Sequence, residues 1–231
     1  MCENAGKLCM EELLRTINEF RAWQAARFPG RNPREISGEW ETWYEGWSEI
    51  NTAFCKVLQE ADPKTADKHL LDEMIYIIAR DNECELLMEE LVEYPKWFGV
   101  LCQHSLSTEE ADAKWQFASY LSGCECGHEI RVLILAFVED PDEYVCRRAL
   151  LAMPSIDPDK AAYYAELFWN RDLYAPELKE YQRMAALTVL HEVQSPLLDA
   201  YLEKAKVGEG KYLRQCAEKI ENERRGCTID D

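Results

Sequence analysis

The chain has 231 residues, of which 44 are acidic and 26 basic, so its formal net charge is −18. Binding to DNA, RNA and anionic membranes is driven largely by Lys and Arg, so this charge argues against all three as direct partners. Hydrophobic residues make up 47% of the chain and aromatic residues 11%. That content is enough to bury a core, and it excludes a disordered protein.

The start of the chain and its cysteines indicate a cytoplasmic protein. The first residues are polar, and charged residues interrupt the first helical pattern, so we expect no signal peptide. No stretch approaches the roughly 20 apolar residues that a membrane span needs. Most of the ten cysteines fall inside helical patterns, which is typical of small, reduced thiols. Examples are Cys55, Cys84, Cys146 and Cys216.

Apolar residues recur at i, i+3, i+4 and i+7 along the whole chain, and the alternating pattern of strands is absent. The sequence therefore predicts an all-α protein. In the first half we expect helices over 8–28, 40–58, 70–78 and 86–92. In the second half we expect them over 109–122, 128–139, 142–153, 158–170, 177–193, 196–206 and 210–225. Ser107 and Thr108 resemble a helix N-cap, and Pro141, Pro158, Pro176 and Pro196 stand at helix starts.

The second half contains a repeated pattern. The segments that begin at Tyr144, Tyr181 and Tyr212 align with one another, and each has an alanine five residues later. A period of 31 to 37 residues that holds two helices is typical of an α-solenoid. The small alanine lets the paired helix approach closely.

Residues 137–153 resemble the turn and second helix of a HEAT repeat: an Asp-rich turn, then Val-Cys-Arg-Arg-Ala-Leu. They depart from the family pattern at Cys146, Arg148 and Leu150. The resemblance covers about residues 107–225. It implies a HEAT-like superhelix of antiparallel helix pairs, preceded by a divergent helical part (1–106) and followed by a tail (226–231). We expect these parts to form one all-helical domain, of a kind that usually serves as a binding scaffold.

Cys124, Cys126 and His128 form the sharpest candidate metal motif, with Cys102 and His104 upstream. Thiolate and imidazole suit zinc. The spacing differs from the usual Cys-x-x-Cys knuckle, however, so we predict a turn here and assign neither a metal nor a cofactor. A zinc-binding regulator stays open as an alternative.

Trp40, Trp43 and Trp47 are spaced so that one helix would present them on one face. Such aromatic residues are usually part of the core, although they could also anchor a partner. The opposite face of the same predicted helix carries Glu41, Glu45 and Glu49.

The negative charge is concentrated in residues 35–95, where sixteen acidic and four basic residues give a net charge of −12. We expect five of these acidic residues in a single helix: Glu83, Glu85, Glu89, Glu90 and Glu93. The block serves either solubility or the docking of a basic partner. In the second half, the candidate partner-binding residues are Tyr144, Arg147, Tyr181 and Arg183. The alternative is that the tyrosines pack between repeats and the arginines pair with the nearby Asp140 or Glu180.

The chain lacks a Gly-rich phosphate loop, a Gly-x-Ser-x-Gly elbow and a His-Glu-x-x-His motif, and we assign no catalytic residue. The sequence favours a non-catalytic scaffold whose acidic face binds a basic protein, for example a bacterial immunity protein that neutralises a cationic toxin. The alternatives are the zinc-binding regulator and a HEAT-like enzyme similar to DNA glycosylases or bilin lyases. The oligomeric state stays open.

Overall fold

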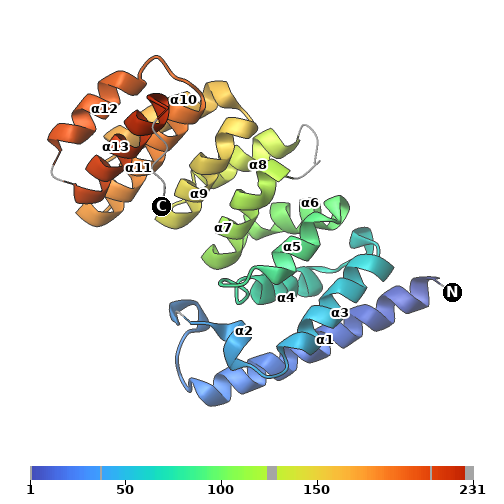
Figure 1. Cartoon of the computed structure of the whole chain (residues 1–231). Coiled ribbons are helices and arrows are strands. Elements are labelled where there is room, and N and C mark those ends of the chain that lie inside the picture. Colours follow the sequence, from blue (N-terminus) through green and yellow to red (C-terminus); the bar gives the residue numbers. More distant parts are fainter. Residues whose placement is uncertain (1, 37, 124–128, 209, 227–231) are drawn as a thin grey trace. The chain divides into compact units, whose positions relative to one another are not determined.

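The computed structural model describes residues 2–36, 38–123, 129–208 and 210–226. This part of the chain contains helices and no strand, which confirms the all-α prediction (Figure 1). None of its helices is both long and apolar enough to span a bilayer. The chain divides into two compact units, residues 1–129 and 130–231, so the predicted start of the repeats at residue 107 falls inside the first unit.

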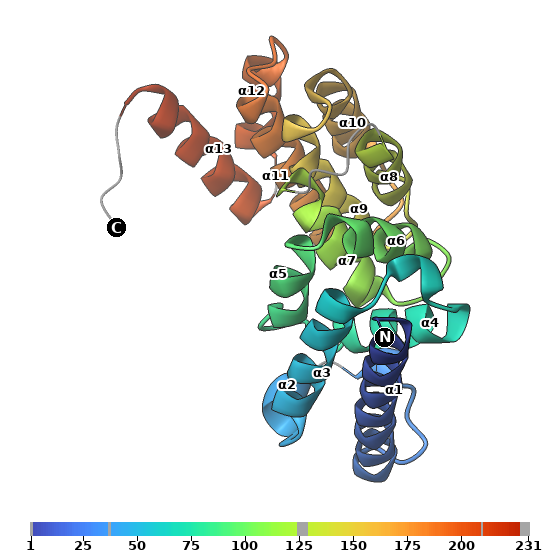
Figure 2. The same cartoon turned by 90° about the vertical axis from the view of Figure 1, so that its right-hand side faces the viewer.

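Unit 1 holds α1 (Cys2–Arg27), α2 (Trp40–Trp43), α3 (Trp47–Glu60), α4 (Lys68–Ile78), α5 (Leu86–Val92), α6 (Pro95–Ser105) and α7 (Ala111–Tyr120), with short 3₁₀ turns at Pro33–Glu35, Pro63–Thr65 and Leu121–Gly123. The long helix α1 packs along α3, and α3 packs on α5 (Figure 2). Helices α4, α6 and α7 pack on one another.

An aromatic cluster holds α1 against the segments that follow it. The ring of Phe20, which is fully buried, lies 5.2 to 6.2 Å from the rings of Tyr44, Trp47, Trp40 and Tyr76. Trp40 and Trp47 are therefore core residues, as their spacing indicated, whereas Trp43 is 43% exposed. Buried aromatic pairs of this kind add to the apolar burial that stabilises the core.

The prediction of one helix over 40–58 was wrong, because the chain leaves the helix at Tyr44 and re-enters it at Trp47. Tyr44 adopts an extended backbone and turns its ring onto Phe20 and over Gly46. A Cβ at Gly46 would lie 2.8 Å from that ring, so only glycine leaves it room. The break separates the tryptophans and also the acidic residues expected on the opposite face. Glu41 lies in α2, Glu45 in the turn and Glu49 in α3.

The helix predicted over 86–92 is confirmed as α5, but the expectation that all five acidic residues lie within it was wrong. Glu83 and Glu85 precede α5, and Glu93 follows it. Glu85 has a φ of 55°, in the left-handed region, which is uncommon for a residue with a side chain. In addition, α7 begins at Ala111 rather than 109, because Thr108 is in a turn and Glu110 takes the N-cap position.

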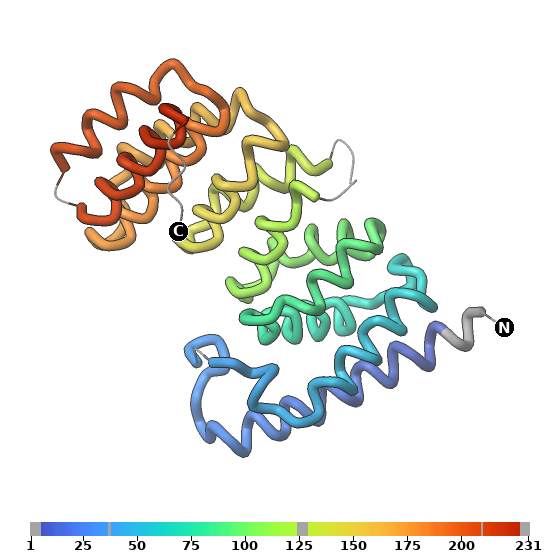
Figure 3. Tube along the Cα trace, viewed as in Figure 1, coloured from blue at the N-terminus to red at the C-terminus, as the bar shows by residue number. Residues whose placement is uncertain are grey.

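Unit 2 holds most of α8 (Glu129–Val138), together with α9 (Glu143–Ala152), α10 (Pro158–Asn170), α11 (Pro176–Glu192), α12 (Leu198–Val207) and α13 (Lys211–Arg224), with a 3₁₀ turn at Met153–Ser155. Pro158 and Pro176 open their helices as predicted, whereas Pro141 and Pro196 lie before theirs. Short loops join α10 to α11 and α12 to α13, and within each pair the two helices pack together (Figure 3). Helix α11 also contacts both α9 and α13.

The aligned positions of the repeated pattern have matching environments in unit 2. Tyr144, Tyr181 and Tyr212 are exposed by 40%, 42% and 52%, and the alanine five residues after each is fully buried. Those alanines are Ala149, Ala186 and Ala217. The pattern thus marks equivalent places on α9, α11 and α13.

Candidate protein-binding surface

An acidic surface lies on unit 1, over the turn that precedes α5 and along α5 itself. We define it by Glu83, Glu85, Glu89, Glu90 and Glu93, of which all but Glu85 are exposed. Helix α5 packs against α3. Burial raises the pKa of the Cys55 thiol on α3, and the nearby Glu90 carboxylate adds to the rise. The surface therefore extends along the side of unit 1 where these two helices meet.

Glu41 of α2 holds the turn beneath this surface. Its Oε1 accepts hydrogen bonds from the backbone N–H groups of Glu83 and Cys84, both at 2.9 Å. The bonds join residues more than 40 positions apart in the sequence. Glu41 thus stabilises the turn that carries the acidic surface, in addition to contributing negative charge.

Asp81 is a buried carboxyl below the same turn. Its Oδ2 accepts a hydrogen bond from the N–H of Leu87, in the first turn of α5, while its Oδ1 has no hydrogen-bond partner among the described residues. Burial raises the pKa of Asp81 to about 7, and the nearby carboxylates of Glu41, Glu85 and Glu89 add to the rise. Asp81 is therefore protonated in a large fraction of molecules at neutral pH.

The exposed carboxylates of the acidic surface are unpaired. Glu83, Glu89, Glu90 and Glu93 form no ion pair with any residue that the structure describes. Three of the four basic residues between positions 35 and 95 bind acidic residues elsewhere: Lys56 binds Glu12, Lys68 binds Asp72 and Arg80 binds Glu110. The charges of Glu83, Glu89, Glu90 and Glu93 are therefore not neutralised by an ion pair among the described residues.

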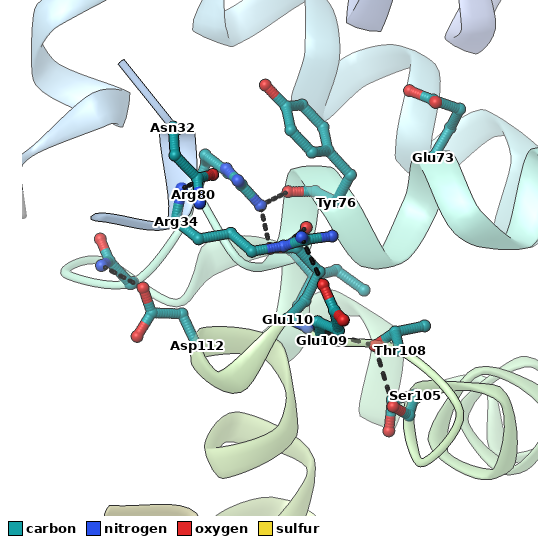
Figure 4. A network of polar contacts seen from close by, with 12 residues as sticks. Asn32, Arg34, Glu73, Tyr76, Arg80, Ser105, Thr108, Glu109, Glu110 and Asp112 are labelled. Atoms are coloured by element: carbon teal, nitrogen blue, oxygen red, sulfur yellow. Dashed lines mark hydrogen bonds and ion pairs between the residues drawn. The ribbon is translucent and has the colours of Figure 1, made fainter. Parts of the chain in front are cut away.

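In a buried ionic network elsewhere in unit 1, a glutamate is paired with two arginines (Figure 4). Glu110 accepts hydrogen bonds from Arg34 at 2.9 Å and from Arg80, whose side chain is 3% exposed. Arg34 also reaches the exposed Glu109, and Arg80 stacks on the ring of Tyr76. No pattern in the sequence indicated this network, because its members come from separate parts of the chain and carry no common motif.

Two acidic candidates lie apart from the acidic surface. Burial raises the pKa of Tyr44, and the carboxylates of Glu19 on α1 and of Glu49 add to the rise. Glu49 therefore lies on the side of unit 1 where α1 and α3 meet. Glu45 is exposed in the turn between α2 and α3. The eight acidic candidates of the sequence are thus not one continuous group.

In unit 2, the candidates Tyr144, Arg147 and Tyr181 lie together. The Arg147 guanidinium lies 4.9 Å from the centre of the Tyr144 ring and 5.3 Å from that of Tyr181, and its Nε donates to Glu143 at 2.8 Å. Arg183 is separate, since it stacks on Trp169 and donates to the carbonyl oxygen of that residue. Both arginines are therefore engaged within the unit, whereas the two tyrosine rings are exposed.

Of the zinc motif, Cys124, Cys126 and His128 lie outside the described residues. Cys102 is fully buried, and Nε2 of His104 is hydrogen-bonded to the Asp72 carboxylate at 2.7 Å. Among the residues that the structure describes, no three or more His, Cys, Asp or Glu side chains are grouped as metal ligands.

Six cysteines are described as free thiols: Cys9, Cys55, Cys84, Cys102, Cys146 and Cys216. The prediction that Cys84 lies inside a helix was wrong, because it is exposed in the turn before α5. Burial raises the pKa of each of the six, so at neutral pH they remain thiols rather than nucleophilic thiolates.

No protein-family model, no curated protein and no solved structure matches the chain.

Proposed function

We propose that this chain is a non-catalytic, protein-binding scaffold whose acidic surface binds a basic protein. One observation carries the proposal. Glu83, Glu89, Glu90 and Glu93 are exposed and unpaired on one side of unit 1, while nearby basic side chains bind other carboxylates. Unpaired charge of one sign steers a partner of the opposite sign and orients it on contact.

We further propose that the chain is an α-solenoid of the HEAT-like kind. The support comes from unit 2, where α11 contacts both α9 and α13, and each of these helices presents an exposed tyrosine and a buried alanine at the aligned positions. Stacked helix pairs offer extended surfaces, which suits a binding scaffold. A bacterial immunity protein that covers the cationic surface of a toxin is the specific form that we propose.

The raised pKa of the described thiols supports the non-catalytic part of the proposal. A cysteine nucleophile needs a lowered pKa, and each of the six has the reverse. The exposed Cys84 is affected by the carboxylates of Glu41 and Asp81 as well as by partial burial.

The test is affinity capture from an extract of the source cells, followed by affinity measurements with the purified partner. We expect a basic partner, and we expect the E89Q/E90Q/E93Q variant to bind it about tenfold more weakly or worse, with a smaller dependence on salt.

The matched control is E177Q/E192Q/E218Q, which removes the same charge from three exposed positions of unit 2. It should bind as the unmodified chain does. A partner with an acidic surface, or equal loss of affinity in both variants, would overturn the proposal.

A further inference from the structure

A groove of about 650 Å³ lies in unit 1 between the N-terminal part of α1, the end of α3 and the start of α4. Its residues are distinct from those of the acidic surface. The volume is within the range of protein sites that bind small molecules or a few side chains of a partner. The groove therefore has the size for a short segment of another protein.

The floor of the groove is apolar. Met10 and Leu14 lie one turn apart on α1 and are half-buried, and Leu70 of α4 and Ala61 complete the floor. At the narrow end, α1 comes so close to the end of α3 that a Cβ on Gly6 would lie 3.3 Å from the carbonyl oxygen of Glu60. The backbone of Ala61 is fixed by a hydrogen bond from the Trp97 indole.

The rim of the groove is acidic. It carries Glu11, Glu60, Asp62 and Asp67 against a single base, Lys7, which pairs with Glu11 at 3.8 Å. Asp62 and Asp67 are held in place because each accepts a backbone N–H at the start of the next helical turn. The rim thus combines a net negative charge with positions that the fold fixes.

We propose that this groove is a second contact site for the same partner, and that it takes a segment with an apolar side chain flanked by Lys or Arg. A segment without an apolar side chain would leave the apolar floor uncovered, and an anionic segment would be repelled by the acidic rim. The inference rests on the proposed function, since it assigns the groove to the basic partner proposed there.

The test uses three short peptides and amide NMR spectra of the full chain: an amphipathic Lys/Leu peptide, a Lys/Ser peptide of equal charge, and a Glu/Leu peptide. We expect the Lys/Leu peptide to shift the signals of Gly6, Met10, Leu14 and Ala61. The Lys/Ser peptide should shift only the signals of the acidic surface, and the Glu/Leu peptide should shift neither group.

Two variants test the two parts of the site. M10K places a cation in the floor, where its flexible stem still reaches solvent, and should weaken Lys/Leu binding about tenfold. Its matched control is L8K, which makes the same change at an exposed position of α1 outside the groove. E11Q/E60Q removes two rim charges without touching the floor and should weaken binding severalfold.

The outcomes separate this inference from the proposed function. If the Lys/Leu peptide shifts only the acidic surface, the groove assignment fails and the proposed function stands. If the Glu/Leu peptide binds the groove as tightly, the assigned charge of the occupant is wrong. If neither cationic peptide binds anywhere on unit 1, both proposals fall. Equal weakening by M10K and L8K also contradicts the groove.

Discussion

Two regions of unit 1 use the same residue type in opposite ways. In the buried network, Glu110 lies between Arg34 and Arg80, and the Arg80 side chain is almost completely removed from solvent. On the acidic surface, the exposed glutamates before and along α5 meet no cation at all among the described residues. One region neutralises charge inside the fold, and the other presents it to solvent.

The acidic residues of unit 1 therefore fall into two classes, those paired inside the fold and those left unpaired at its surface. Arg80 and Asp81 are neighbours in sequence, yet Arg80 binds Glu110, whereas Asp81 accepts a hydrogen bond from a backbone N–H of α5. A buried ion pair contributes mainly through the large cost of breaking it, whereas unpaired surface carboxylates cost little and remain available to a partner. The contrast makes distinct predictions for the two regions.

The largest effect is expected at Glu110. The E110Q substitution leaves the buried Arg80 guanidinium without its anion, and we expect it to lower the free energy of unfolding by about 3 kcal/mol. E109Q is the matched control, because Glu109 binds Arg34 from an 82% exposed position. It should cost about 1 kcal/mol or less. Urea unfolding followed by tryptophan fluorescence measures both, and equal costs would show that burial does not distinguish the two glutamates.

A smaller, pH-dependent effect is expected at Asp81, where the two regions meet. Its pKa is raised from the ordinary 3.8 to about 7 in the folded chain, so the folded state keeps a proton that the unfolded state has lost between these values. Stability should therefore fall as pH rises from about 4 to 7, with no further loss from this group above that range.

D81N removes this titration and keeps an oxygen that can accept the N–H of Leu87. We expect its stability relative to the unmodified chain to rise with pH, by an amount on the order of 4 kcal/mol between pH 4 and pH 8. Unfolding curves at a series of pH values measure the slope, with D159N as a control at an exposed carboxyl of unit 2. Parallel slopes for D81N and the unmodified chain would contradict the assignment.

The sequence predicted what depends on local periodicity and missed what depends on distant contacts. Helices were found because apolar residues repeat along them, and Trp40 and Trp47 were correctly expected in the core. Two local features were not predicted: the break between Trp43 and Trp47, and the turn that places Glu83 and Glu85 before α5 instead of within it. The first needs the Tyr44 ring to turn onto Phe20, which lies on another helix, and the second is held by Glu41. Such contacts leave no trace in the spacing of neighbouring residues.

The candidate site also has a part that the sequence predicts and a part that it does not. The concentration of acidic residues before and along α5 was predicted, because it follows from the composition of that segment. The role of Asp81 was not, since an aspartate after an apolar helix is ordinary in a turn and nothing local indicates its burial. The pairing of Arg80 with Glu110, thirty positions away, was equally hidden, so which acidic residues remain unpaired followed only from the fold.

The smallest effect is expected on the acidic surface itself. Glu89 and Glu93 are four residues apart, so their like charges repel. Glu90 and Glu93 lie at the C-terminal end of α5, where negative charge is unfavourable, whereas Glu89 lies in the first turn. E89Q/E90Q/E93Q should therefore raise the free energy of unfolding by about 1 kcal/mol or less at low salt, and the gain should vanish at high salt. E177Q/E192Q/E218Q, with its charges on two helices of unit 2, should gain less. If the α5 variant instead loses stability, its carboxylates support the fold like Glu110, and the contrast between the two regions disappears.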